Sequence, residues 1–385
     1  MWHAKYVKYP LFFLLSILGF AENAYCLCPS NINEIQTVID FDRLKYNIPG
    51  IEASISCRDG ESPHDFVSGT TTLDKETPVN AAHLFQVGSE TKSFIATILL
   101  QMESEGLLSI HDHLSNYFEN LPETWQAITI EQLLNHSSGL FNYTDVLEEM
   151  GRDSNFDFSK DWSSQELIEL VIDKPLYFPP GGGWHYSNTN YVLAGLIIEK
   201  VTGHSLNEAI ESRLTSPLQL TNTYYLPTVY NRDILDRMAH GYSVRGYFPD
   251  EPRDITYTST SWANAAGAIV ATSHDMAIWF RHLMQGSLLA PQQMRELTTT
   301  VEGTLPRSTQ KIGYGLGVMY DEESFGEQAW WHSGGTLGYS ALMVWLKNRD
   351  IVITVNINHV SATKDIYGLM KDLAKFIQDS QPGMS

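Results

Sequence analysis

Three short motifs, far apart along the chain, constrain its fold more than any other feature of the sequence. They are Ser89-Glu90-Thr91-Lys92, Tyr186-Ser187-Asn188 and His332-Ser333-Gly334-Gly335. A serine hydroxyl is a weak nucleophile unless a base lies within hydrogen-bonding reach. If the motifs act together, the chain must fold so that these three distant segments line one pocket.

The first motif has the spacing of a nucleophile and its base on one face of a helix. If Ser89 opens a helix, Lys92 follows one turn later on the same side, and its amine can reach the serine oxygen. Lysine accepts a proton near neutral pH only when burial or nearby positive charge lowers its pKa. Apolar residues at helical spacing over 94–102, with Gly106 as the stop, predict a rigid, buried helix behind the motif.

In this order and context, the motifs resemble those of the serine β-lactamase and penicillin-recognising superfamily. The similarity is to the branch that contains class C β-lactamases, D-Ala-D-Ala carboxypeptidases, D-aminopeptidases and related esterases. It extends over most of the chain, through residues 84–121, 128–142, 178–224, 265–289 and 313–356.

The resemblance implies a role for each residue of the site. Ser89 matches the nucleophile, Lys92 its proton acceptor and Tyr186 a second general acid/base. Asn188 matches the amide that holds the lysine and a substrate carbonyl. The backbone N–H groups of Ser89 and Gly335 match the oxyanion hole.

The third motif departs from class C β-lactamases, which usually carry Lys-Thr-Gly on the strand that lines the cleft. Here His332, Ser333 and Gly334 occupy that strand and are expected to bind substrate together with Gly335. A histidine is only partly protonated near neutral pH, whereas a lysine is charged. We therefore expect weaker, pH-dependent anchoring of a substrate carboxylate. The sequence identifies no arginine as a carboxylate clamp.

Simpler interpretations of these residues remain open. Tyr186 could be an amphipathic residue at a helix start, because residues 187–190 have good capping chemistry. His332 could be a half-buried histidine at a strand edge. The stretch 136–139 is interpreted as a helix end, with a capping box from Thr129 to Gln132 before it and Gly139 as its left-handed stop.

His111-Asp112-His113 contains metal-ligand residue types, but no matching His or Cys cluster closes a coordination sphere. We therefore predict neither a metal nor another cofactor. A metallohydrolase built on His111 and His113 is a remote alternative.

The N-terminus has the layout of a secretory signal peptide, with Lys5 and Lys8 before an apolar run over 10–20. We expect cleavage near residue 26, a periplasmic or secreted protein, and a single catalytic domain over 27–385 with no membrane span. The formal net charge of -20 disfavours nucleic acid, so the expected partner is a small-molecule or peptide substrate. In an oxidising compartment Cys28 could pair with Cys57, leaving Cys26 spare or removed.

The expected fold class is α/β (α+β), of the β-lactamase/transpeptidase-like type. Strands predicted over 51–57, 66–71, 313–320, 329–332, 341–346 and 351–357 place both chain ends in one antiparallel sheet. Helices over 32–46 and 362–377 would pack on it. The sheet lobe would comprise about 30–85 and 300–380, and a helix-rich lobe about 86–299, with the active site between them and the polar loop 227–260 at its border.

The function expected from the sequence is hydrolysis through a covalent acyl-serine, most like that of a D-Ala-D-Ala carboxypeptidase acting on peptidoglycan-type peptides. A β-lactamase or a carboxylesterase of the same superfamily is the alternative. A catalytically degenerate binding or scaffolding member is the alternative of another class. Oligomeric state does not follow from the sequence.

Overall fold

The computed structural model describes residues 28–29, 31–57, 61–74, 77–153, 155–225, 227–228, 230–243, 251–305, 308–360 and 364–380. The expected signal peptide and Cys26 lie outside the described residues. Within the described part of the chain, no helix combines the length and the apolar character needed to cross a bilayer.

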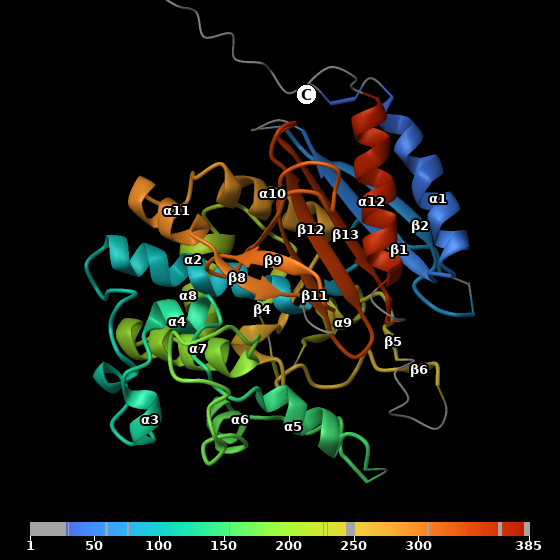
Figure 1. Cartoon of the computed structure of the whole chain (residues 1–385). Coiled ribbons are helices and arrows are strands. Elements are labelled where there is room, and N and C mark those ends of the chain that lie inside the picture. The colour runs from blue at the N-terminus through green and yellow to red at the C-terminus, as the bar shows by residue number, and fades with distance from the viewer. Residues whose placement is uncertain are drawn as a thin grey trace, which may run out of the picture.

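An antiparallel sheet of eight strands forms the centre of one lobe (Figure 1). In spatial order its strands are β2 (His64–Gly69), β1 (Gly50–Ser56), β13 (Ile351–Ile357), β12 (Ser340–Leu346), β11 (Ala329–Gly335), β10 (Met319–Asp321), β9 (Lys311–Tyr314) and β8 (Val301–Thr304). The two N-terminal strands are paired to the C-terminal six through β1 and β13. The predicted mixed fold with one antiparallel sheet built from both chain ends is confirmed.

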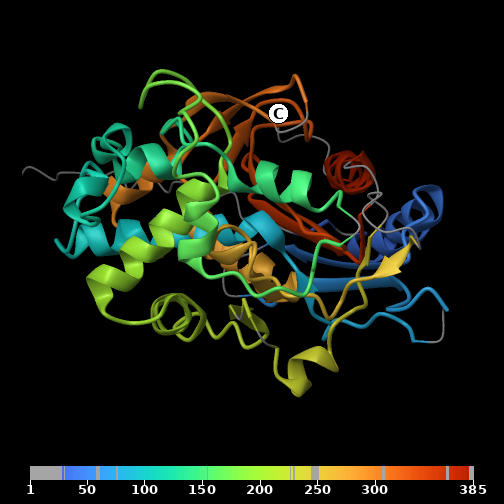
Figure 2. The same cartoon turned by 90° about the horizontal axis from the view of Figure 1, so that it is seen from below.

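Helices cover both faces of this sheet. α1 (Ile35–Lys45) and α12 (Lys364–Asp379) lie side by side on one face, as Figures 1 and 2 show. α1 packs on β2 and β1, and α12 packs on β12 and β13, over the face where Ile51, Ala53 and Ile55 of β1 are fully buried. Two of the three cysteines, Cys28 and Cys57, form a disulfide that joins the segment before α1 to the end of β1.

The other side of β1 is polar, yet it is buried too, because α10 (Ser273–Met284) packs on it. The Ser273 N–H donates to Glu52 Oε2 at 2.9 Å, and Arg281 Nε donates to Ser56 Oγ at 2.7 Å. α10 was expected in the helical lobe by sequence position, but these bonds and its contacts attach it to the sheet. The N-cap of α10 is Thr272, whose side chain accepts a hydrogen bond from the Asp275 N–H.

The second lobe is rich in short helices around a large apolar core. They are α2 (Thr91–Ser104), α3 (Glu123–Gln126), α4 (Ile130–Leu134), α5 (Tyr143–Met150), α6 (Ser164–Glu169), α7 (Asn188–Thr202), α8 (Leu206–Ile210), α9 (Arg232–Leu235) and α11 (Pro291–Thr298). The predicted capping box at Thr129 opens α4, and capping boxes at Ser163 and Ser205 open α6 and α8. Two small sheets, which the sequence did not predict, also occur: β3 (Phe85–Gln86), β7 (Ile269–Ala271) and β4 (Thr223–Tyr225), and β14 (His359–Val360), β5 (Tyr242–Ser243) and β6 (Arg253–Asp254).

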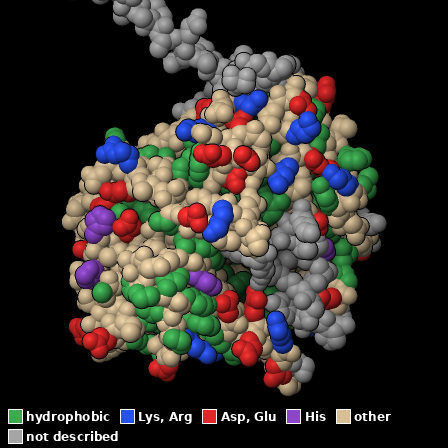
Figure 3. Space-filling model, in the orientation of Figure 1, with side chains coloured by type: hydrophobic (Ala, Val, Ile, Leu, Met, Phe, Trp, Pro, Cys, Tyr) green, Lys and Arg blue, Asp and Glu red, His purple; other side chains and the backbone are tan. Residues whose placement is uncertain are grey.

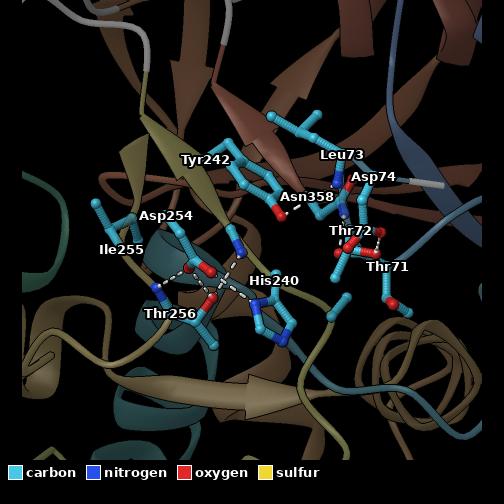
Figure 4. A network of polar contacts seen from close by, with 12 residues as sticks. Thr71, Thr72, Leu73, Asp74, His240, Tyr242, Asp254, Ile255, Thr256 and Asn358 are labelled. Carbon is cyan, nitrogen blue, oxygen red and sulfur yellow. Dashed lines mark hydrogen bonds and ion pairs between the residues drawn. The ribbon is translucent and has the colours of Figure 1, made fainter. Parts of the chain in front are cut away.

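A polar network attaches the described parts of the loop 227–260 to the sheet (Figure 4). His240 Nδ1 lies 2.6 Å from Asp254 Oδ2, and the Leu73 N–H donates to the Tyr242 hydroxyl at 3.2 Å. Asn358 Nδ2, just after β13, donates to the carbonyl of Thr71 at 3.1 Å. The loop is therefore held to the end of the sheet that carries the third motif.

Candidate active site

The first motif lies at the junction of a 3₁₀ turn, η2 (Gly88–Glu90), with α2. Ser89 is partly exposed, whereas Lys92, one turn on, is fully buried. Apolar residues 94–102 anchor the helix as predicted, and Phe94 stacks on Trp279 of α10 with ring centres 3.7 Å apart. The nucleophile candidate is thus mounted on a helix fixed in the core.

Lys92 Nζ lies within hydrogen-bonding distance of three oxygens. They are Ser89 Oγ at 2.9 Å, Asn188 Oδ1 at 2.8 Å and the carbonyl of Ala266 at 2.6 Å. The last two can only accept, so a neutral amine would donate its two hydrogens to them and keep its lone pair for the serine hydroxyl. Burial lowers the pKa of Lys92 well below its ordinary value, and no ion pair to Lys92 exists among the described residues. This arrangement suits a general base.

Tyr186 lies beside the same amine. Lys92 Nζ is 4.9 Å from the centre of the Tyr186 ring. Burial raises the pKa of the Tyr186 phenol well above its ordinary value, and a hydrogen bond with the Ser89 side chain opposes that rise. A phenol that stays protonated next to the nucleophile can act as a proton donor.

Asn188 is the first residue of α7 and is fixed from two sides. Its N–H donates to Asn142 Oδ1 at 2.9 Å, and its Nδ2 donates to Thr144 Oγ1 at 3.1 Å. These bonds leave Asn188 Oδ1 directed at Lys92. Ser187 takes the N-cap position without a side-chain capping bond, so the simple capping interpretation of this stretch does not describe it.

The third motif runs along β11 to the edge of the site. Gly88 and Gly334 allow the closest approach: a Cβ on Gly88 would lie 2.5 Å from the N of Gly335, and one on Gly334 would lie 1.8 Å from the carbonyl oxygen of Val87. A Cβ on Gly334 would also lie 3.2 Å from the backbone N of Ser89. Both expected oxyanion-hole segments therefore lie against each other.

The structure corrects the expected role of His332. Its side chain is fully buried on β11, a central strand, and burial together with the nearby Lys92 lowers its pKa to about 3. The imidazole is therefore neutral at physiological pH, and the expectation of a partly protonated carboxylate anchor was wrong. It is also more deeply buried than the alternative interpretation as a half-buried edge residue supposed.

His332 instead ends a chain of buried hydrogen bonds that the sequence did not predict. His332 Nδ1 donates to the Ser333 carbonyl at 2.7 Å, so its Nε2 accepts from the Tyr314 hydroxyl at 3.0 Å. His136 Nδ1 accepts from the Ser187 N–H and from Asn190, which assigns its Nε2 as the donor to Tyr314 at 3.1 Å. The network joins the second and third motifs through His136 and Tyr314.

The structure also bears on two further sequence predictions, the helix end at 136–139 and the His111 cluster. The left-handed residue after α4 is His136 itself, with φ 64°; Gly139, with φ 80°, forms a separate turn. His111 lies at the surface, 3.4 Å from Glu131, and within the described residues no group of three His, Cys, Asp or Glu side chains could hold a metal.

The arrangement of these motifs agrees with the comparison to known proteins. A family model described as Beta-lactamase matches residues 34–375. The chain belongs to the Beta-lactamase family. It is therefore a member of the β-lactamase and penicillin-binding protein superfamily, as its motifs suggested.

Several relatives are similar over most of this chain. Penicillin-binding protein 4* of Bacillus subtilis is 28% identical over 303 residues, which cover 75% of this chain and 64% of that protein. The chain thus spans less than two thirds of the length of the curated relatives it matches, which include the protein flp of Staphylococcus aureus at 63%.

Two solved structures are similar over almost their whole length. A D-stereospecific amidohydrolase from Streptomyces sp. has a TM-score of 0.70 and 31% identity, covering 87% of this chain and 97% of that one. D-amino acid amidase from Ochrobactrum anthropi, solved in complex with D-phenylalanine, has a TM-score of 0.79 and 25% identity, covering 91% and 99%.

Proposed function

We propose that the protein hydrolyses amide bonds at the carbonyl of a D-amino acid through an acyl-enzyme on Ser89. The observation that carries this proposal is the environment of Lys92, whose buried amine faces the Ser89 hydroxyl with its other two donors already engaged. The D-amino acid preference is taken from two structural relatives, one named a D-stereospecific amidohydrolase and the other a D-amino acid amidase solved with D-phenylalanine.

In the proposed cycle, the proton of Ser89 moves to Lys92 while Ser89 Oγ attacks the carbonyl carbon. The N–H groups of Ser89 and Gly335 hold the oxyanion. Tyr186 gives its proton to the departing amine as the C–N bond breaks, and Lys92 returns a proton to Tyr186. Water then attacks the acyl ester and its proton passes to the same pair, which returns a proton to Ser89 Oγ as the Oγ–C bond breaks and the acid leaves.

The carboxypeptidase function expected from the sequence is the second candidate. It is favoured by the similarity to penicillin-binding protein 4*. A carboxypeptidase must hold the free carboxylate of its substrate, and the neutral His332 supplies no charge for that purpose. An amide with an uncharged leaving group makes no such demand, so we place the amidase first and the carboxypeptidase, β-lactamase and esterase after it.

Replacing Ser89 by Ala tests the proposal. We expect turnover of D-phenylalanine amide to fall by several orders of magnitude, on the scale of catalytic-serine replacements. Intact-mass analysis after incubation with a fluorophosphonate, and separately with a penicillin, should give an adduct on the wild type only. An adduct of equal yield on the Ser89→Ala variant would show that the nucleophile is elsewhere, and the decay time of a penicillin adduct would rank the β-lactamase candidate.

A further inference from the structure

A cavity of about 70 Å³ opens beside the catalytic groups and has no part in the cycle above. Its wall is largely aromatic and aliphatic, and comes from α5, the segment before α6, the segment before residue 264 and the turn after β11. The apolar residues of this wall are Leu147, Phe156, Phe158, Trp162, Trp262 and Leu337. The volume matches a few water molecules, or one side chain of a substrate.

Two residues of the wall connect the cavity with the site. Thr144 accepts the hydrogen bond from Asn188 Nδ2 at 3.1 Å, and Asn188 in turn holds Lys92. Thr336 directly follows Gly335, the expected oxyanion donor. Figure 3 shows the surface hollowed between α5 and the ends of β11 and β12, with apolar side chains beside the hollow. The cavity wall is therefore one hydrogen bond away from Asn188 and one residue away from Gly335.

The position of Tyr186 indicates which half of the substrate the cavity faces. Tyr186 would protonate the leaving amine, and it is not part of the cavity wall. Its ring packs instead against His136, with centres 4.3 Å apart, and against Tyr314 at 6.3 Å. The leaving group would depart on that side, so the cavity lies on the side of the group that stays attached to Ser89.

The hydroxyl of Thr336 in the cavity wall also indicates that a ligand binds there. The Thr336 side chain is 2% exposed, and its hydroxyl has no hydrogen-bond partner among the described residues. A buried hydroxyl without a partner is costly. The α-amino group of a bound acyl donor could supply the missing partner after a rotation of the threonine side chain.

We propose that this cavity binds the apolar side chain of the acyl donor, so that the enzyme selects D-amino acids with aromatic or long aliphatic side chains over D-alanine. The inference rests on the proposed function, since it assigns a subsite of the same reaction. The described wall also carries Glu148 and Asp157 and contains no Lys or Arg, so acidic side chains would be repelled. Filling such a pocket is worth roughly ten- to hundredfold in kcat/KM.

The test compares D-phenylalanine amide with D-alanine amide, and in parallel the p-nitrophenyl esters of 3-phenylpropionic and acetic acid. Leu337→Trp fills the cavity, and Trp262→Ala removes part of its wall. Leu107→Trp is the matched control, because Leu107 is 51% exposed and lies outside the cavity. The rate of fluorophosphonate labelling at Ser89 reports whether each variant keeps a working nucleophile.

We expect the wild type to favour the phenyl substrate by roughly ten- to hundredfold. Leu337→Trp should lower that ratio at least about tenfold while labelling persists, and Leu107→Trp should leave it unchanged. A ratio near one in the wild type, or one that both cavity variants leave intact, would overturn the inference while the proposed function stands. Loss of wild-type labelling would instead overturn the proposed function.

Discussion

At the scale of single residues, the surroundings of Lys92 show what would let a common side chain act as a base. Desolvation alone lowers its pKa, because the surrounding oxygens are carbonyl, amide and hydroxyl groups, not carboxylates. A carboxylate partner would have held the proton on the amine. The lowered pKa of Lys92 therefore depends on the kind of oxygens around its amine as well as on its burial.

The protonation of Lys92 predicts the pH dependence of acylation. The amine accepts a proton only when neutral, so the rate of Ser89 labelling should rise as pH increases through the lowered pKa of Lys92 and then level off below its ordinary value of 10.5. The raised pKa of Tyr186 keeps the phenol protonated, so no alkaline fall should occur up to its ordinary value of 10.0. Fluorophosphonate labelling rates over the pH range measure this; a rate that falls steadily from acid to neutral pH would contradict it.

Tyr314 predicts a stability effect without direct contact with substrate. Tyr314→Phe removes the hydroxyl between His136 and His332 and leaves both Nε2 atoms buried without that partner. We expect the free energy of unfolding to fall by about 2 kcal/mol, measured by urea denaturation. Tyr320→Phe is the control on the next strand, since its hydroxyl is exposed, and it should change stability by less than about 0.5 kcal/mol. Equal effects of the two substitutions would argue against the network.

At the scale of elements, the approach of η2 to β11 depends on glycine. Gly88 and Gly106 both have positive φ, 53° and 72°, but a Cβ on Gly106 would meet nothing within 4 Å, whereas one on Gly88 would meet the Gly335 N at 2.5 Å. Gly88→Ala should therefore reduce activity at least about a hundredfold, the scale of a lost oxyanion donor. Gly106→Ala should cost only about 1 kcal/mol of stability from backbone strain. Comparable kcat/KM values for the Gly88→Ala and Gly106→Ala variants would contradict the proposed need for a close approach of η2 to β11.

Elements also show where sequence patterns mislead. Residues 313–320 look like one strand, but they form the end of β9, a turn and the start of β10. The turn packs on both α11 and α2: a Cβ on Gly315 would lie 2.2 Å from the carbonyl oxygen of Leu297 in α11, and one on Gly317, with φ 76°, would lie 2.8 Å from the carbonyl oxygen of Lys92 in α2. Such contacts are long-range, so alternation of apolar residues could not reveal them.

At the scale of the whole molecule, the disulfide predicts a global effect on stability. Cys28 and Cys57 are 29 residues apart, and closing a loop of that length restricts the unfolded chain. Cys57→Ser should lower the free energy of unfolding by about 3–4 kcal/mol in the chain-entropy model. The control is the wild type unfolded with reductant, which should match the variant. A variant as stable as the oxidised wild type would show that the bond does not form.

The overall design of the molecule followed from the sequence because its signals were local or motif-based. Local sequence patterns were enough to predict the apolar strands at both ends, the capping box at Thr129 and the contact of Ser89 with Lys92. The cavity wall and the His136, Tyr314 and His332 network could not be predicted, since they combine segments from distant parts of the chain. Charge also depended on burial: His332 is neutral because folding removes it from water.

The sheet pairs β1, near the start of the chain, with β13, which ends at Ile357. During translation, Ser89 and Lys92 leave the ribosome long before the strand that carries Gly335. A nascent polypeptide therefore carries the proposed nucleophile and base before Gly335 has been added, and β1 cannot yet pair with β13. The proposed active site is therefore completed only late in synthesis.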